Sequence, residues 1–272
     1  MTAPRKDPRP ASQRIADDLR AAIDSGDIGP GEKLPTTKTL VEQYGVTAET
    51  VRQAVLRLKA AGVVTSRQGG GVYARVLPPL KRLGIQRYDK AGWRDRGEVA
   101  FIADRVASGR EYNRTDQTQV VSRVPASRAV ATGLGIPEGT EVVSRARLVK
   151  EAGVPTHMLT SYYKVQHVEG TRLEDPSPGP AGKGGGFGVF LEQGLEPHQM
   201  TEDLYARMPT PAEAAELELP AGEPVMVLHR TTYTADDTVI EYAVGVHSAS
   251  RFAWTYNFLI PDSAVEGDSD AQ

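Results

Sequence analysis

Several features common in other protein classes are absent from this sequence of 272 residues. It contains no cysteine, which excludes disulfide bonds, thiolate zinc sites and cysteine nucleophiles. It has no apolar run of the roughly eighteen residues that a membrane-spanning helix needs. The first residues also lack the apolar core of a signal peptide. We therefore predict a cytoplasmic protein with no membrane span.

Motifs of common catalytic and cofactor sites are also missing. The five histidines are scattered without metal-binding spacing, and no G-x-S-x-G nucleophile elbow occurs. The glycine-rich stretch 179–188 contains Gly-Lys but lacks the spacing of a phosphate-binding P-loop. We interpret 179–188 as a flexible loop insertion before a helix at 187–193. We predict no catalytic residue, no metal site and no cofactor.

The charge is divided unevenly along the chain. The net charge is −3, but residues 1–76 hold twelve Lys or Arg and eight Asp or Glu, which gives +4. Residues 77–272 hold twenty Lys or Arg and twenty-seven Asp or Glu, which gives −7. A basic N-terminal part next to an acidic remainder fits a module that faces DNA phosphates, joined to a body that does not.

The N-terminal part predicts three helices and a β hairpin. Apolar residues at helical spacing indicate a first helix at 12–25, with Ser12 as its cap. Thr36 and Thr47 are suited to cap two further helices, joined by a turn in the stretch 34–62. That stretch has the form of a helix-turn-helix, whose second helix enters the DNA major groove. Two short β runs then flank the glycines of VVTSRQGGGVYARV and predict a hairpin wing.

Residues 12–76 resemble the winged helix of GntR-family regulators. The resemblance is carried, in order, by IADDLRAAIDSGDIGPGEKLP, LPTTKTL, VTAETVRQAVLRLKAAGVV and RQGGGVY. It implies that the DNA contacts are Lys38, Thr47, Thr50 and Arg52, with Gln68 and Gly69 in the wing. Ala48 stands where many relatives have an arginine that reads guanine, and a methyl group cannot make that bidentate contact.

Each of these residues also has a purely structural interpretation. Thr47 can serve only as a helix cap, and Arg52 can be a solvated surface charge. Lys38 can neutralise a phosphate without reading a base, and the wing glycines can serve only the turn.

The C-terminal part contains an internal repeat. The stretch AVATGLGIPEGTEVVSRARLV (129–149) aligns with AEAAELELPAGEPVMVLHRTTY (212–233), so that Arg147 matches Arg230. Each copy reads as a helix, an LP-x-G or IP-x-G turn and a strand, followed by a second strand after a polar turn. This predicts an α+β domain with a mostly antiparallel sheet and pseudo-twofold character. A cleft between the two halves is a natural ligand site.

This part resembles the UTRA effector domain of the HutC subfamily of GntR regulators, a fold related to chorismate lyase. The resemblance covers roughly 98–260 and includes VVSRARLV, the block from FGVFLEQGLEPHQM to VMVLHRTTY, and IEY. It implies that a small, anionic effector binds Arg145, Arg147, His157, Thr160 and Glu241. Arg145 and Arg147 share one strand face by period two, and guanidinium groups there suit a phosphate or carboxylate. Leu159 stands where sugar-phosphate-binding relatives usually have Glu, which disfavours a sugar phosphate.

Structural interpretations again stay open. The two arginines can pair with acidic neighbours, and His157 and Glu241 can be satisfied residues of the sheet. The predicted organisation is a disordered N-terminus (1–11), a winged helix-turn-helix domain (12–76), a linker (77–97), an effector-binding and dimerisation domain (98–260) and a disordered acidic tail (261–272).

The resulting hypothesis is a transcriptional repressor. A homodimer would bind a palindromic operator on double-stranded DNA, and an effector would release or modulate it. One alternative is an effector-independent repressor whose C-terminal domain only dimerises or binds a partner. The other is an enzyme similar to chorismate lyase, for which the sequence offers no catalytic dyad.

Overall fold

The computed structural model describes residues 9–29, 31–66, 70–74, 80–151, 153–219 and 222–257. We call residues 9–74 the head and residues 80–257 the body, and we describe each by itself. The predicted wing contacts Gln68 and Gly69, most of the predicted disordered N-terminus and the predicted acidic tail lie outside the described residues. No helix in these ranges is long and apolar enough to cross a membrane.

The head has the predicted three helices and a wing. Its elements are α1 (Ala11–Ser25), α2 (Thr37–Tyr44), α3 (Ala48–Ala60), β1 (Val64–Ser66) and β2 (Val72–Ala74). Strands β1 and β2 pair antiparallel, so the hairpin is confirmed. Side chains from all five elements form one core, in which Val51, Ala54 and Leu58 supply the inner face of α3.

Two of the three predicted helix caps are confirmed. The Thr36 hydroxyl accepts a hydrogen bond from the Thr39 amide, and the Thr47 hydroxyl accepts one from the Thr50 amide. Ser12 was the wrong choice for α1, because that helix begins one residue earlier, after Pro10, with no side-chain cap. The Pro10 carbonyl instead accepts from the amides of Gln13 at 2.9 Å and Arg14 at 3.1 Å, which closes the first turn of the helix.

The body is built around one antiparallel sheet of six strands. They are β4 (Gln117–Pro125), β5 (Glu141–Glu151), β6 (Val154–Lys164), β7 (Gln199–Arg207), β8 (Val225–Tyr233) and β9 (Val239–Ser248). Their order across the sheet is β4-β5-β6-β9-β8-β7. From each edge towards the centre, β5 and β6 of the first repeat occupy the same places as β8 and β9 of the second, so that β6 and β9 form the central pair. The predicted pseudo-twofold is therefore confirmed, and each half gains a third strand, β4 or β7, that the sequence repeat did not reveal.

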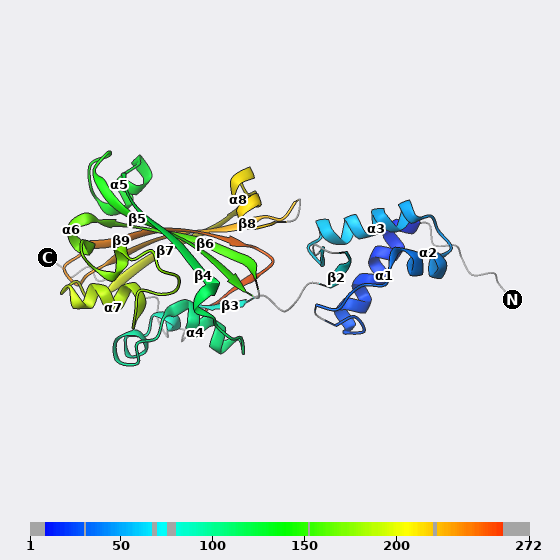
Figure 1. Cartoon of the computed structure of the whole chain (residues 1–272), viewed down its shortest axis with the longest axis horizontal. Helices are drawn as coiled ribbons and strands as arrows, with labels where there is room; N and C mark the ends of the chain where they lie inside the picture. Colours follow the sequence, from blue (N-terminus) through cyan, green and yellow to red (C-terminus); the bar gives the residue numbers. More distant parts are fainter. Residues whose placement is uncertain are drawn as a thin grey trace, which may run out of the picture.

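The two faces of this sheet have different coverings. Figure 1 shows α5 (Arg128–Leu134) and α8 (Pro211–Glu216), the helices of the repeat, on one side. It shows α4 (Ala100–Ala107) and α7 (Gly185–Glu192) on the other. We call these the repeat-helix face and the pocket face. The remaining body elements are β3 (Leu80–Leu83), η1 (Ile85–Tyr88), η2 (Ala91–Asp95), η3 (Arg114–Asp116), α6 (Val165–Val168), η4 (Arg172–Glu174) and β10 (Phe252–Thr255).

Most of the segment predicted as a linker is folded into the body. Strand β3 pairs in parallel with β10, so that Leu80 lies opposite Phe252. Leu80 is buried, and so is Trp93 of η2. A prediction from local composition missed this because the partner strand is far away in the sequence. The glycine-rich stretch 179–188 also departs from the prediction, since its last residues form the start of α7.

Candidate nucleic-acid interface and ligand pocket

The four described DNA-contact candidates lie near the N-termini of the second and third helices. Lys38 is exposed in the first turn of α2, and Arg52 is exposed on α3. Thr47 caps α3 and shares a hydrogen bond with the Thr50 hydroxyl at 3.0 Å. The structural interpretation of Thr47 as a cap therefore holds, whether or not it also contacts DNA.

Arg52 is held only loosely. Its Nη1 donates to Glu49 Oε2 at 2.8 Å, but both side chains are well exposed. Exposed ion pairs of this kind contribute only about 0–1 kcal/mol. A DNA phosphate or a guanine edge can therefore replace Glu49 at little cost.

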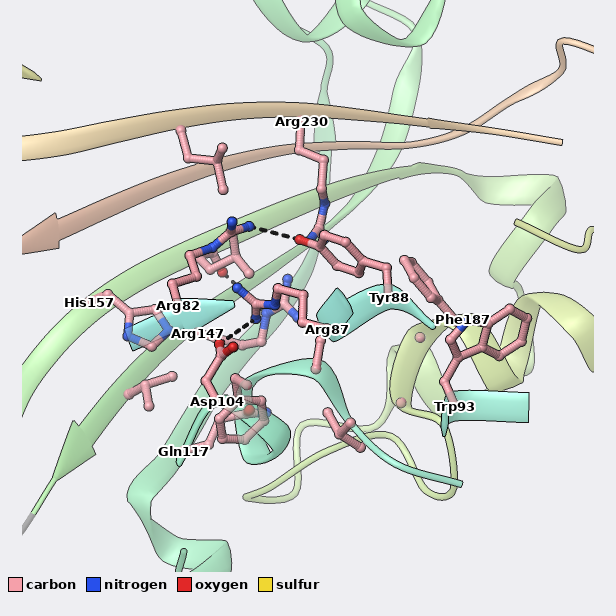
Figure 2. Close-up of a pocket in the computed structure, with 18 of the residues that line it drawn as sticks. Arg82, Arg87, Tyr88, Trp93, Asp104, Gln117, Arg147, His157, Phe187 and Arg230 are labelled. Carbon is pink, nitrogen blue, oxygen red and sulfur yellow. Dashed lines mark hydrogen bonds and ion pairs between the residues drawn. The ribbon is translucent and has the colours of Figure 1, made fainter. Parts of the chain in front are cut away.

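A partly open pocket lies on the pocket face of the sheet. Its cavity volume is about 110 Å³. The walls come from the sheet, from the start of α7 and from the segment 80–105 that precedes the first strand of the sheet. Figure 2 shows Arg82, Arg87, Arg147 and Arg230 extending into it from different elements. Arg105 also lines it, so five guanidinium groups surround one small cavity.

Glu241 lies in the pocket wall and is already saturated. Its Oε2 accepts from Arg230 at 2.7 Å and from the Thr232 hydroxyl at 3.3 Å. Its Oε1 accepts from the hydroxyls of Ser161 at 2.6 Å and Tyr163 at 3.4 Å. Burial raises the pKa of this carboxyl, but Arg230, Arg147 and the Ser161 hydrogen bond together outweigh that effect, and the pKa is lowered from its ordinary value. Glu241 is thus a charged structural anchor of the wall.

Tyr88 joins the preceding segment to the sheet. Its hydroxyl donates to Glu202 Oε1 at 2.7 Å and accepts from Arg82 at 2.8 Å and Arg230 at 3.2 Å. Arg82 also donates to Glu202 Oε2 at 3.0 Å. This network ties β3 and η1 to strands β7 and β8.

A second ion pair lies inside the preceding segment. Arg87 and Asp104 are 3.1 Å apart, and Asp104 Oδ1 also accepts from the Leu83 amide at 3.0 Å. Burial raises the pKa of Asp104 against the opposing charge of Arg87, and burial likewise lowers the pKa of Arg87. Desolvation thus has the larger effect on both groups, although each is the ion-pair partner of the other.

The two arginines of β5 have different surroundings. Arg145 is buried and does not line the pocket; its Nη1 donates to the carbonyls of Leu173 at 2.9 Å and Asp175 at 2.8 Å. Arg147 lines the pocket and is only half-buried; it donates from Nε to the Leu159 carbonyl at 3.2 Å and from Nη2 to the Ser161 hydroxyl. The effector role predicted for Arg145 thus gives way to a structural one, because backbone carbonyls after η4 occupy its guanidinium.

His157 is in the pocket wall, stacked on His247. Their ring centroids are 4.8 Å apart and the rings are nearly parallel at 8°. Burial is the main reason why both pKa values lie well below the ordinary value. His157 is lowered further by His247 and by nearby arginines, among them Arg87 and Arg147. Both imidazoles are therefore neutral at physiological pH.

Thr160 is on the wrong face for the predicted effector contact. It lies opposite Ala146 and Val244 in the register, on the repeat-helix face. His157 and Thr160 are three positions apart on one strand, and the period of two places such residues on opposite faces. Thr160 therefore cannot share a ligand with His157.

Several pocket residues were missed from the sequence. They are Arg82, Arg87, Tyr88, Trp93, Phe187, Arg230 and His247. The repeat alone contained a signal for one of them, because Arg230 aligns with Arg147 and both line the pocket. The residues before 98 carried no such signal, since their place in the pocket depends on the β3–β10 pairing.

A winged helix-turn-helix head joined to a sheet domain with an arginine-lined pocket is the architecture of DNA-binding transcriptional regulators. Residues 11–74 match the family described as bacterial regulatory proteins, gntR family, and residues 111–253 match the UTRA domain. The chain belongs to the GntR family of transcriptional regulators, with the UTRA domain of the HutC-subfamily architecture. It is a family of regulators and not of enzymes.

Similar proteins cover nearly the whole chain. An uncharacterised HTH-type transcriptional regulator of Streptomyces coelicolor is 56% identical over 261 residues, covering 96% of this chain and 97% of that protein. The HTH-type transcriptional repressor NagR of Bacillus subtilis is 23% identical over 274 residues, covering 94% and 98%. A crystal structure of a GntR-family transcriptional regulator has a TM-score of 0.57 at 26% identity, covering 93% of this chain and 99% of that one.

Proposed function

We propose that this regulator is a repressor that binds a palindromic operator as a homodimer and is released or modulated by a small anionic effector in the body. The observation that carries the effector part is the pocket lined by five arginines. The pocket is bounded by β3, the first body element after the head, so ligand binding there can change how the head is held. Such control requires the effector to bind one arrangement of the protein more tightly than the other, by about 2–5 kcal/mol of binding free energy.

The operator is tested by selection from random duplex DNA with the full-length protein. Two copies related by a twofold axis read inverted half-sites, so we expect the selected sequences to be inverted repeats. A gel-shift titration with the selected duplex then gives the affinity. Selection of unrelated sequences, or of single half-sites without symmetry, would contradict the proposed binding mode.

The homodimer is supported by an uncovered part of the repeat-helix face. Val120 and Tyr205 are 68% and 46% exposed there, opposite Ala146 and Val227 in the register. Burying exposed apolar side chains such as Val120 against a second copy removes their surface from water, which favours association. Light scattering is expected to give a dimer for the native chain and a monomer for Val120→Asp. An unchanged dimer in that variant would exclude this face.

An effector-independent repressor is the second candidate. It is favoured by the saturation of Glu241 and by the Arg82–Glu202 pair, which satisfy each other without a ligand. A thermal-shift screen against anionic and neutral metabolites separates the two candidates, because a ligand that binds the native state raises the melting temperature. A flat response to every compound, with normal operator binding, would favour the second candidate.

A further inference from the structure

The pocket holds one more cation than its own carboxylates match. Four of its five arginines have a carboxylate partner in the described residues: Arg82 with Glu202, Arg87 with Asp104, Arg105 with Asp116, and Arg230 with Glu241. Among the described residues, Arg147 donates to the Leu159 carbonyl and to the Ser161 hydroxyl, which in turn donates to Glu241. Arg147 and Arg87 are the two members of the set that are half-buried, whereas Arg82, Arg105 and Arg230 are buried.

Two buried donors around the cavity are unused. Arg87 Nε and Arg230 Nε have no hydrogen-bond partner among the described residues. Both side chains line the pocket. A buried polar atom without a partner is costly, and such atoms are rare in native proteins. Unused nitrogens next to an uncompensated guanidinium call for a ligand rich in acceptors.

The electrostatics of the wall point the same way. The arginines lower the pKa of His157 and His247 further than burial alone does. This means that the potential at the stacked imidazoles is positive in the unliganded protein. An anion in the cavity is attracted by that potential, and a neutral molecule of the same shape is not.

The size and the other walls limit the rest of the ligand. A cavity of about 110 Å³ is smaller than the roughly 150 Å³ that holds one benzene molecule in another protein. Leu159, Trp93 and Phe187 supply apolar walls, and Trp93 and Phe187 meet edge to face with centroids 5.5 Å apart. A cavity of this size suits a small ligand better than a sugar phosphate, and one of its five arginines lacks a carboxylate partner among the described residues.

We propose that the pocket takes a small monocarboxylate, whose carboxylate group is held by Arg147 and Arg87 and whose short apolar body lies against Leu159 and Phe187. A guanidinium fork matches the two oxygens of a carboxylate. Arg87 comes from the segment ahead of the UTRA match, so the ligand would join that segment to the sheet. This inference rests on the proposed function and narrows its effector to one chemical class.

The test uses the full-length protein and matched probes. Thermal shift and titration calorimetry are carried out with isobutyrate, its neutral amide isobutyramide, and methyl phosphate. We expect isobutyrate to raise the melting temperature in a concentration-dependent way and the other two to have little effect. Acetate and benzoate then show how much apolar volume the pocket accepts.

Two variants assign the binding to the proposed residues. Arg147→Gln is expected to weaken isobutyrate binding by about tenfold or more, the cost of a lost charged hydrogen bond. It leaves no carboxylate without its partner, so the chain should still fold. Arg87→Lys keeps the charge opposite Asp104 but removes the fork, and should weaken binding less. Arg128→Gln is the matched control, because Arg128 has an 89% exposed side chain outside the pocket.

Three outcomes would overturn the inference. They are equal stabilisation by isobutyramide, stabilisation by methyl phosphate alone, and no response to any carboxylate in the native protein. Unchanged isobutyrate affinity in Arg147→Gln would also overturn the assignment. Operator binding is measured on the same samples, so a failure of DNA binding would count against the regulator itself, separately from the ligand.

Discussion

Arg145 offers the sharpest test of the division between structural and ligand-binding arginines in the body. We expect Arg145→Met to destabilise the body and to leave effector binding intact in the molecules that remain folded. The substitution keeps an unbranched stem and removes the guanidinium donors. The reverse pattern is expected for Arg147→Gln, two residues along the same strand.

The magnitude follows from the hydrogen bonds that are lost. Arg145 Nη1 donates to two carbonyls at 2.9 and 2.8 Å, those of Leu173 and Asp175. A buried acceptor that loses its donor costs about 1–3 kcal/mol. Part of this is offset because the buried charge itself no longer has to be desolvated. We therefore expect the free energy of unfolding to fall by about 2–4 kcal/mol.

The assay is urea unfolding followed by tryptophan fluorescence. Both tryptophans of the chain, Trp93 and Trp254, are in the body, so the signal reports the body and not the head. The midpoint should fall for Arg145→Met and change little for Arg147→Gln. An unchanged midpoint in Arg145→Met, together with loss of ligand binding, would refute the structural role.

Three further predictions concern the head and the pH dependence of the body. Arg52→Ala should weaken operator binding by about tenfold or more in a gel-shift titration without unfolding the head, whereas the exposed Arg20→Ala should not. Thr47→Ala should cost the head about 1 kcal/mol by circular dichroism, and Thr47→Asn should recover this stability; equal loss in both would exclude the cap as the cause. The Arg207 hydrogen bond lowers the pKa of Glu213 to about 2. The stability from this pair is therefore complete above the unfolded pKa, near roughly 4.3, and is lost as pH falls toward 2. In Glu213→Gln the urea midpoint of the body should therefore depend less on pH in that range than it does in the native chain. The same pH dependence in both proteins would contradict this.

The sequence alone was sufficient to predict those features whose interactions lie within a few residues of each other. Thr36 and Thr47 were recognisable as caps because each bonds an amide three residues ahead, within a single turn. The repeat was visible because each copy is one continuous helix, turn and strand pair. The strand period of two also places His157 and Thr160 on opposite faces of the sheet, which is a local property that the sequence contains. The winged head and the antiparallel α+β body follow from patterns of this kind.

Tertiary structure decided which residues make the pocket. Period two placed Arg145 and Arg147 on one face, but it could not say that backbone carbonyls of 172–175 cover the first and leave the second open. Arg82 meets Glu202 from 120 positions away, in a segment whose composition indicated only a linker. Local patterns fix the face of a strand, and which distant groups reach that face depends on how the whole chain packs.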